Sequence, residues 1–158
     1  MLHIRQDPTD PHGSSDRIGR VLPEHVQRMY DELKLFLEEH PDWLTEVDSP
    51  DRILQLCAMG AYEAWVALSP KGELEVLGIC SWDRHQFESY YHILYLAGSN
   101  LWAHFRAGLA EAEKYTYLNG GAEIVLLGRH GWKRALRRFG YESPKVLLSK
   151  NVRKARGN

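Results

Sequence analysis

The hydrophobic pattern of the chain changes its period at Gly60, and this change limits the folds that are open to it. Before Gly60, apolar residues recur every three or four positions, which predicts amphipathic helices. After it, short segments rich in β-branched and aromatic residues lie between Gly- and Pro-containing turns, which predicts strands. Farther along, helical and strand-like segments alternate. We therefore expect helix stripes to be buried against the faces of one sheet.

Two helices are expected before Gly60. The first begins near Pro23, because proline suits the first turn of a helix, and ends before His40-Pro41. The second begins at Ser49-Pro50-Asp51, where a capping residue precedes a proline and an acid. The expected buried residues are Leu22, Val26, Met29, Leu33, Phe36 and Leu37 in the first helix, and Ile53, Leu54, Cys57 and Ala58 in the second.

The segments after Gly60 predict a hairpin followed by alternating strands and helices. Residues 61–69 and 74–82 form the hairpin, with Pro70-Lys71-Gly72 between them. The elements expected next are strand 90–97, helix 101–118, strand 123–127, helix 131–139 and strand 145–150. This order predicts an α/β (mixed α+β) fold, with a central mixed sheet of about five to six strands and helices on both faces.

The ends of the chain are expected to differ from its middle. Residues 1–20, rich in Pro, Asp, Gly and Ser, predict a flexible N-terminal arm; residues 21–150 form the expected domain, and residues 151–158 a basic tail. No apolar run could span a bilayer or serve as a signal peptide, so we expect a soluble protein of the cytoplasm that does not bind membranes. Cys57 and Cys80 stand apart from each other and predict reduced core residues.

Charge is strongly segregated along the sequence. Residues 129–158 hold ten Lys or Arg and one acid, for a net charge of +9, whereas the rest of the chain has a net charge of −10. Five of these cations follow helical spacing on a polar face opposite Trp132 and Leu136: Arg129, Lys133, Arg134, Arg137 and Arg138. A solvated helix face is one interpretation, and a site for phosphates, nucleic acid or an acidic protein surface is the other.

Two stretches of the chain are similar to a known family. One is YYHILYLAG followed by a helix that ends in NGGAEIVLLG, and the other is GRHGWKRALRRFGYE followed by a strand. Together with the element order, they make residues 20–150 resemble the GNAT (acyl-CoA N-acyltransferase) superfamily. The second stretch is particularly similar to GNAT-like proteins encoded by tailed phages and prophages, often near virion genes.

The resemblance implies where acyl-CoA would bind. Members of the family hold the CoA pyrophosphate on the amides of a Gly-rich turn at a helix start, which here would be formed by Gly98, Ser99, Asn100 and Trp102. The family's Gln or Arg followed by two closely spaced glycines is missing, and Trp102 stands where a phosphate would approach. Where many members have a proton-donating tyrosine, this chain has Leu136. We therefore expect no cofactor and no catalytic residue.

Other residues are weaker candidates for chemistry. Five carboxylates on or beside the expected strands are possible general bases: Glu63, Glu73, Glu75, Asp83 and Glu88. Strand carboxylates usually point to water, so the favoured interpretation is that these side chains are solvated. His85 and His92 lack a third ligand at a recognisable spacing, so no metal site is expected. Strand alternation places His92 on one face with Tyr90, Leu94 and Leu96, and Tyr90, Tyr91, Tyr95 and Trp102 are expected to gather near the cleft of a GNAT fold.

Three hypotheses follow from these observations. The favoured one is a non-catalytic GNAT-fold protein that acts through its surfaces, as a phage virion or assembly component with a protein partner. The second is a divergent N-acetyltransferase that uses acetyl-CoA. The third is an anion- or nucleic-acid-binding module that uses the basic helix and tail.

Overall fold

The computed structural model of the chain describes residues 17–128, 130–143 and 150. The chain divides into two compact units, one ending at Leu127 and the other beginning at Gly128. None of the helices in these described residues is long and apolar enough to cross a membrane.

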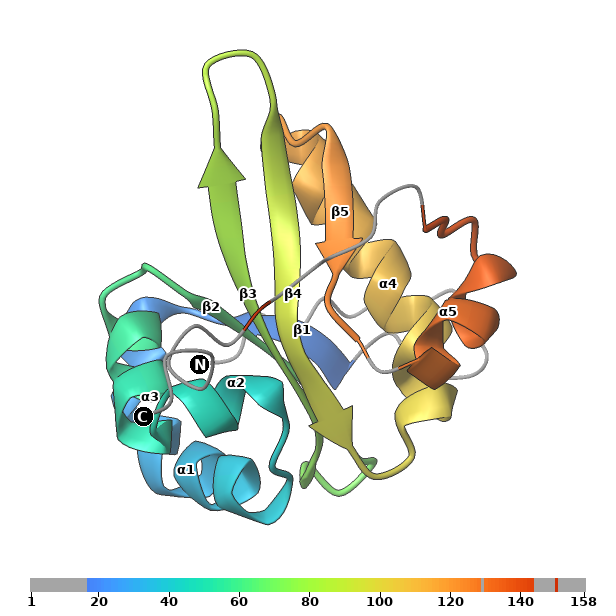
Figure 1. The fold of residues 1–158 in the computed structure, drawn as a ribbon. Coiled ribbons are helices and arrows are strands. Elements are labelled where there is room, and N and C mark those ends of the chain that lie inside the picture. The colour runs from blue at the N-terminus through green and yellow to red at the C-terminus, as the bar shows by residue number, and fades with distance from the viewer. Residues whose placement is uncertain (1–16, 129, 144–149, 151–158) are drawn as a thin grey trace. The chain divides into compact units, whose positions relative to one another are not determined.

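The first unit is built on one mixed sheet, as the sequence predicted (Figure 1). The spatial order of its described strands is the chain order, β1-β2-β3-β4-β5, and neighbours are antiparallel except for the parallel pair β4 and β5. The strands are β1 (Ile18–Val21), β2 (Glu63–Leu68), β3 (Leu74–Arg84), β4 (Ser89–Gly98) and β5 (Glu123–Leu126).

The predicted N-terminal arm of residues 1–20 is too long, because its last residues belong to β1. Ile18 pairs with Ala67 of β2, and Val21 pairs with Ala64. Both Ile18 and Val21 are buried, one on each face of the sheet, so apolar burial holds this short strand in place.

Three helices cover one face of the sheet. The first helix starts later than predicted: two 3-10 turns, Pro23–His25 and Gln27–Met29, precede α1 (Tyr30–Glu39). A short helix that was not predicted, α2 (Trp43–Val47), begins at a capping box formed by Asp42 and Thr45. The predicted cap Ser49 accepts the Arg52 amide at the start of α3 (Pro50–Ala58). The face they cover buries Leu33, Leu37, Ile53, Leu54, Leu77 and Ile79, none of them more than 1% exposed.

The opposite face of the sheet is covered by α4 (Leu101–Leu118), which confirms the prediction of helices on both faces. Its buried residues form one stripe along the helix, and two of them, His104 and Thr116, are polar. The full set is His104, Phe105, Leu109, Ala112 and Thr116. Thr116 donates its hydroxyl to the Ala112 carbonyl, as a buried threonine in a helix can.

A β-bulge in β4 overturns part of the predicted alternation. Ile79 pairs with Tyr95 and Cys80 with Ile93, so Leu94 is an extra residue without a partner on β3. His92 and Leu96 therefore point to opposite faces, whereas strict alternation had placed them together. The same bulge separates Tyr91, which lies on the α4 face, from Tyr95, which lies on the face of α1, α2 and α3.

The second unit contains α5 (His130–Arg137). As the sequence predicted, Lys133, Arg134, Arg137 and Arg138 are exposed and Leu136 is buried. Gly140 closes this segment with a positive φ of 86°, a conformation that glycine adopts without strain. Arg129, the predicted strand 145–150 before its last residue, and the basic tail 151–158 lie outside the described residues.

Candidate functional site

The turn between β4 and α4 occupies the place where the resemblance puts the CoA pyrophosphate. Only Ser99 and Asn100 separate the end of the strand from the start of the helix. Gly98 has a φ of +147°, and a Cβ at this position would overlap the Glu75 carbonyl oxygen of β3. The close approach of β3 therefore explains why the only glycine of this turn stands at position 98, and no ligand is needed to explain it.

The amides of this turn are partly committed to the protein itself. Ser99 donates its amide to the Glu75 carbonyl at 2.9 Å, and Ala103 donates to the Asn100 carbonyl at 3.1 Å. Asn100 takes the left-handed conformation, with a φ of 56° and no capping hydrogen bond from its side chain. Within the described residues, the amides of Asn100, Leu101 and Trp102 have no backbone carbonyl partner, so they remain to bind an anion in the usual way.

Trp102 does not fill a cleft beside this turn. Its side chain is 54% exposed, and its ring contacts Phe105 on the same helix at a centroid distance of 5.1 Å. The predicted gathering of Tyr90, Tyr91, Tyr95 and Trp102 is therefore wrong. Tyr95 is buried and donates to the His40 carbonyl, while Tyr90 contacts Glu88 in the β3–β4 hairpin.

Strands β4 and β5 part beside the bulge. Their pairing ends where Ile93 meets Leu126, with one more bond from the Leu127 amide to the Ile93 carbonyl. β4 then runs on to Gly98, so on this side its edge after Ile93 has no partner strand in the described residues. Free strand edges can bind a ligand or a partner chain.

A partly buried polar cluster of Arg20, Glu63 and Tyr115 lies between the sheet and α4. Glu63 accepts a hydrogen bond from Arg20 at 2.5 Å and from the Tyr115 hydroxyl at 2.6 Å, and its side chain is 13% exposed. The expectation that this strand carboxylate points to water is therefore wrong. Burial, and then the hydrogen bond to Glu63, raises the pKa of Tyr115 above its ordinary value. The Arg20 guanidinium also stacks over the Tyr115 ring at 4.5 Å.

Aromatic rings enclose this cluster. Tyr115 contacts the rings of Trp65, Trp82 and Tyr91 at centroid distances of 5.3–6.0 Å. Trp65 donates its indole N–H to the Tyr91 hydroxyl at 2.8 Å. Burial raises the pKa of Tyr91 far above its ordinary value, so this hydroxyl stays protonated at neutral pH. The polar groups of the cluster bond to one another, which suits a structural role better than proton transfer.

A second buried pair joins α4 to β3. His104 is 8% exposed, and its Nε2 lies 2.5 Å from Glu75 Oε2. Its other ring nitrogen, Nδ1, is buried and has no hydrogen-bond partner in the described chain. The sequence analysis missed His104, although its helical spacing with Leu101 and Phe105 placed a polar residue on an apolar stripe.

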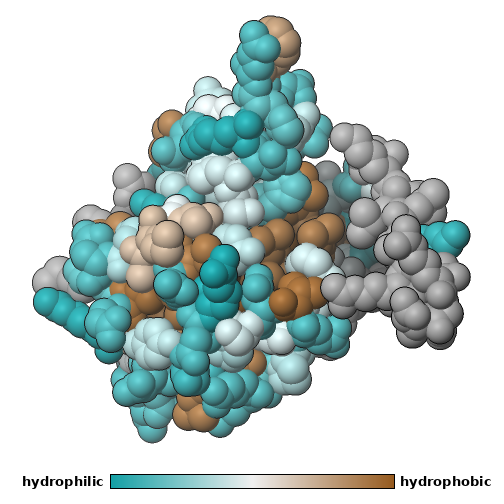
Figure 2. Space-filling view, turned by 60° about the vertical axis from the view of Figure 1, so that its left-hand side comes forward, coloured by the Kyte–Doolittle hydropathy of each residue, from teal (hydrophilic) through white to brown (hydrophobic). Residues whose placement is uncertain are grey.

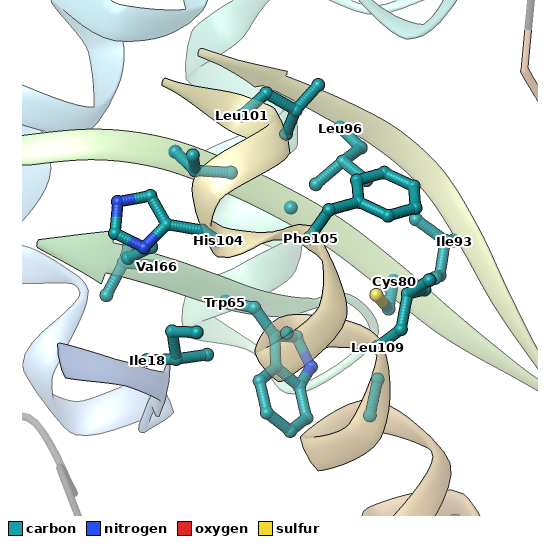
Figure 3. Close-up of a pocket in the computed structure, with 15 residues that line it drawn as sticks. Ile18, Trp65, Val66, Cys80, Ile93, Leu96, Leu101, His104, Phe105 and Leu109 are labelled. Atoms are coloured by element: carbon teal, nitrogen blue, oxygen red, sulfur yellow. The ribbon is translucent and has the colours of Figure 1, made fainter. Parts of the chain in front are cut away.

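His104 lies at the edge of a cavity of about 70 Å³ between α4 and the sheet (Figure 3). Apolar side chains make up most of its wall, and two glycines, Gly78 and Gly108, also line it. Its other lining residues are Ile18, Trp65, Val66, Ala67, Val76, Cys80, Ile93, Leu96, Leu101, Phe105, Leu109 and Ala112.

The remaining candidates lie at the surface. Glu73 and Glu88 are exposed, as expected, and Asp83 contacts both His85, at 2.9 Å, and His92, at 3.7 Å. In the residues that the structure describes, no three His, Cys, Asp or Glu side chains are grouped so as to hold a metal ion. The cations Lys133, Arg134 and Arg137 of α5, and Arg138 directly after it, are exposed, as their spacing predicted.

Comparison with known proteins identifies the fold. No protein-family model matches the sequence, and no curated protein matches it either. Among solved structures, a GCN5-related N-acetyltransferase from Ralstonia eutropha is similar with a TM-score of 0.61, at 19% identity, over 86% of this chain and 97% of that chain. The chain has the GNAT acetyltransferase fold.

Two further structures support the assignment of the GNAT fold. Glucosamine-6-phosphate N-acetyltransferase from Arabidopsis thaliana matches with a TM-score of 0.60 at 13% identity, over 85% of this chain and 97% of that chain. A ribosomal-protein-alanine N-acetyltransferase from Brucella melitensis matches with a TM-score of 0.61 at 10% identity, over 85% and 98%. The GNAT fold hosts its chemistry in particular residues, so activity has to be argued from the site.

Proposed function

We propose that this protein uses the GNAT fold as a binding scaffold and does not transfer acyl groups from acyl-CoA. The observation that carries the proposal is the two-residue turn between β4 and α4. Its glycine is required by the contact with Glu75, and its Ser99 amide is already bonded to the same carbonyl. A pyrophosphate binds on several free amides at close range, and the Ser99 and Ala103 amides of this turn are already bonded within the protein.

Two features of other residues support the same proposal. Glu63 and Glu75 are strand carboxylates that bond to side chains of α4, and each is held by a basic partner, Arg20 or His104. A general base must reach its substrate, and these carboxylates are already bonded to the protein. Leu136, at the position where the resemblance implies a proton donor, is a buried aliphatic side chain.

The partner in this proposal is another protein. The hairpin of β3 and β4 extends beyond the rest of the sheet (Figure 1), and Figure 2 shows a hydrophobic spot at the end of this projection. Phe87, in the loop between the paired residues Arg84 and Ser89, is 89% exposed. An exposed aromatic side chain on a stiff hairpin suits insertion into a partner's apolar pocket. A virion or assembly component of a tailed phage, present in the host cytoplasm or in the particle, is the specific form of this role that the sequence resemblance favours.

Calorimetric titration with acetyl-CoA tests the proposal. We expect no saturable heat for the full chain under conditions in which an active GNAT-fold acetyltransferase binds. Trp102→Ala is the matched variant, because it removes the ring but keeps the short turn. We expect this variant to bind no acetyl-CoA either. Micromolar binding by the unaltered chain would overturn the proposal, and binding by the variant alone would show that the ring, not the turn, blocks the site.

Catalysis by an N-acetyltransferase is the second candidate, and the free edge of β4 after Ile93 favours it. The acyl chain of a thioester could lie along this edge. The test is release of free CoA thiol from acetyl-CoA in the presence of a panel of amines. Release above the rate without protein would support this candidate and refute the scaffold.

Binding of anions or nucleic acid is the third candidate, favoured by three exposed cations of α5 and by Arg138 directly after it. Electrostatic binding to DNA or RNA should weaken steeply as salt rises. We expect Arg134→Glu combined with Arg138→Glu to abolish such binding. A flat salt response, or an unchanged affinity in the double variant, would exclude this candidate.

A further inference from the structure

The two glycines in the wall of the cavity under α4 are not explained by the backbone. Gly108 lies in the middle of α4, and a Cβ there would meet nothing within 4 Å. At Gly78 of β3 a Cβ would make only ordinary contacts, the nearest with Leu96 at 3.5 Å. Neither residue has a positive φ. Glycine weakens both helices and strands. Its presence at both positions therefore indicates that the space left by the missing side chains has a use.

His104 gives this space a polar end. Its Nε2 faces the Glu75 carboxylate, so in the neutral ring Nε2 carries the proton and Nδ1 presents a lone pair. This Nδ1 is buried and has no partner in the described residues. Figure 3 shows the ring on the opposite side of the pocket from Phe105. A buried acceptor without a donor costs free energy, which a bound donor would recover.

The size of the cavity limits its ligand. An apolar cavity of about 150 Å³ holds a benzene molecule, so about 70 Å³ suits a molecule of roughly three to five heavy atoms. The apolar walls disfavour water, because a buried water needs two or more polar partners. We propose that this cavity binds a small aliphatic molecule, or the aliphatic end of a larger one, that carries one hydroxyl group and donates it to His104 Nδ1.

Two probes with the same number of heavy atoms test this proposal, 1-butanol and n-pentane. Binding is followed by the NMR signals of the Ile93, Leu96 and Leu109 methyl groups, which line the cavity. We expect saturable shifts with both probes, and the tighter binding with 1-butanol, because n-pentane lacks the hydroxyl group. Shifts with n-pentane alone, or with neither probe, would overturn the proposal, because the cavity would then be an apolar void or closed.

His104→Phe tests the hydrogen bond with little change in ring shape. We expect it to weaken 1-butanol binding by about fivefold, which is the usual effect of one lost hydrogen bond, and to change n-pentane binding by less than twofold. Glu75→Gln is the control: its amide oxygen still accepts from Nε2, so 1-butanol affinity should hold. Equal loss of both probes in His104→Phe would contradict a role for Nδ1.

Gly108→Ala tests the location, because Gly108 lines the cavity and its added methyl group would meet no atom within 4 Å. We expect binding of 1-butanol to fall at least about tenfold while the protein becomes more stable. The control is Ala110→Gly, at an exposed position of the same helix, which should lower stability and leave binding unchanged. Unchanged affinity in Gly108→Ala would place the probe elsewhere. The proposal concerns the space under α4 and not the backbone amides of the β4–α4 turn, so its failure leaves the scaffold proposal standing.

Discussion

The two faces of the sheet are built from alternating residues of the same strands, yet they bury different things. The face under α1, α2 and α3 is filled by aliphatic side chains such as Leu37 and Leu54, both fully buried. The face under α4 holds a cavity, the Glu63 cluster and the pair of His104 with Glu75. Aliphatic burial stabilises a fold, whereas buried polar groups and cavities cost free energy. The first face therefore supplies stability, and the second is the place to look for binding.

The largest expected difference between the faces comes from matched leucines. We expect Leu54→Ala to lower the free energy of unfolding by about 3–5 kcal/mol, since it opens a hole in a filled core. Leu109→Ala should cost about 2 kcal/mol, because Leu109 already borders a cavity and makes fewer contacts. Urea titrations of both variants measure the difference. Equal losses would mean that the two faces are packed alike.

Removal of one charge should distinguish the buried polar cluster from the surface. Arg20→Met leaves Glu63 without its cation, and we expect a loss of about 1–3 kcal/mol, moderated because Arg20 is 31% exposed. The control is Lys34→Met, which breaks the exposed pair with Asp51 and should change stability little. A similar small effect of Arg20→Met would show that the Glu63 cluster is open to water.

Alkaline pH should lower the stability of the folded chain by the same amount through a buried tyrosine on each face. Burial raises the pKa of Tyr91 on one face and of Tyr95 on the other above the ordinary value of 10.0. Below pH 10 both hydroxyls are neutral in the folded and unfolded chain. Above it only the unfolded chain ionises, so stability falls by about 1.4 kcal/mol per pH unit for each tyrosine until the raised pKa is reached.

Tyr91→Phe and Tyr95→Phe measure these two contributions separately. Each variant should lose stability less steeply between about pH 10 and pH 11 than the unaltered chain, by the amount that one tyrosine contributes. The measurement is urea unfolding at a series of pH values. An unchanged slope in Tyr91→Phe alone would mean that water reaches the α4 face.

The smallest expected effect is a gain in stability from a substitution at Gly78. Gly78→Ala places a methyl group in the cavity wall without a close contact, and we expect it to stabilise the protein by about 0.5–1 kcal/mol. Thermal unfolding detects such a gain. A loss of stability would show that the α4 face is already filled at this point.

Much of the fold could be predicted because each long element carries its own period. The helix and strand periods gave the β2–β3 hairpin, α3, α4 and the mixed sheet. β1 and α2 were missed because four or five residues in polar surroundings show no period. The bulge at Leu94 was also missed, since one extra residue does not alter the hydrophobic content of a strand.

The candidate sites could be predicted only where their residues lie close together in the sequence. The loss of the glycine pattern around Gly98 is visible in seven consecutive residues of the sequence. The pairing of Arg20 with Glu63 spans 43 positions, and that of Glu75 with His104 spans 29. Such contacts depend on strand register and helix placement, so a pattern read along the chain does not reveal them.

The most direct test of the account is an NMR titration of the backbone amides in the β4–α4 turn with acetyl-CoA. Up to about 1 mM, the upper end of typical KM values, we predict that the signals of Ser99, Leu101 and Trp102 stay in place. The expectation rests on two contacts of this turn: Gly98 lies against the Glu75 carbonyl, and the Ser99 amide donates to the same carbonyl. Saturable shifts of these three amides would contradict the account and make the protein an acyl-CoA-binding member of the fold.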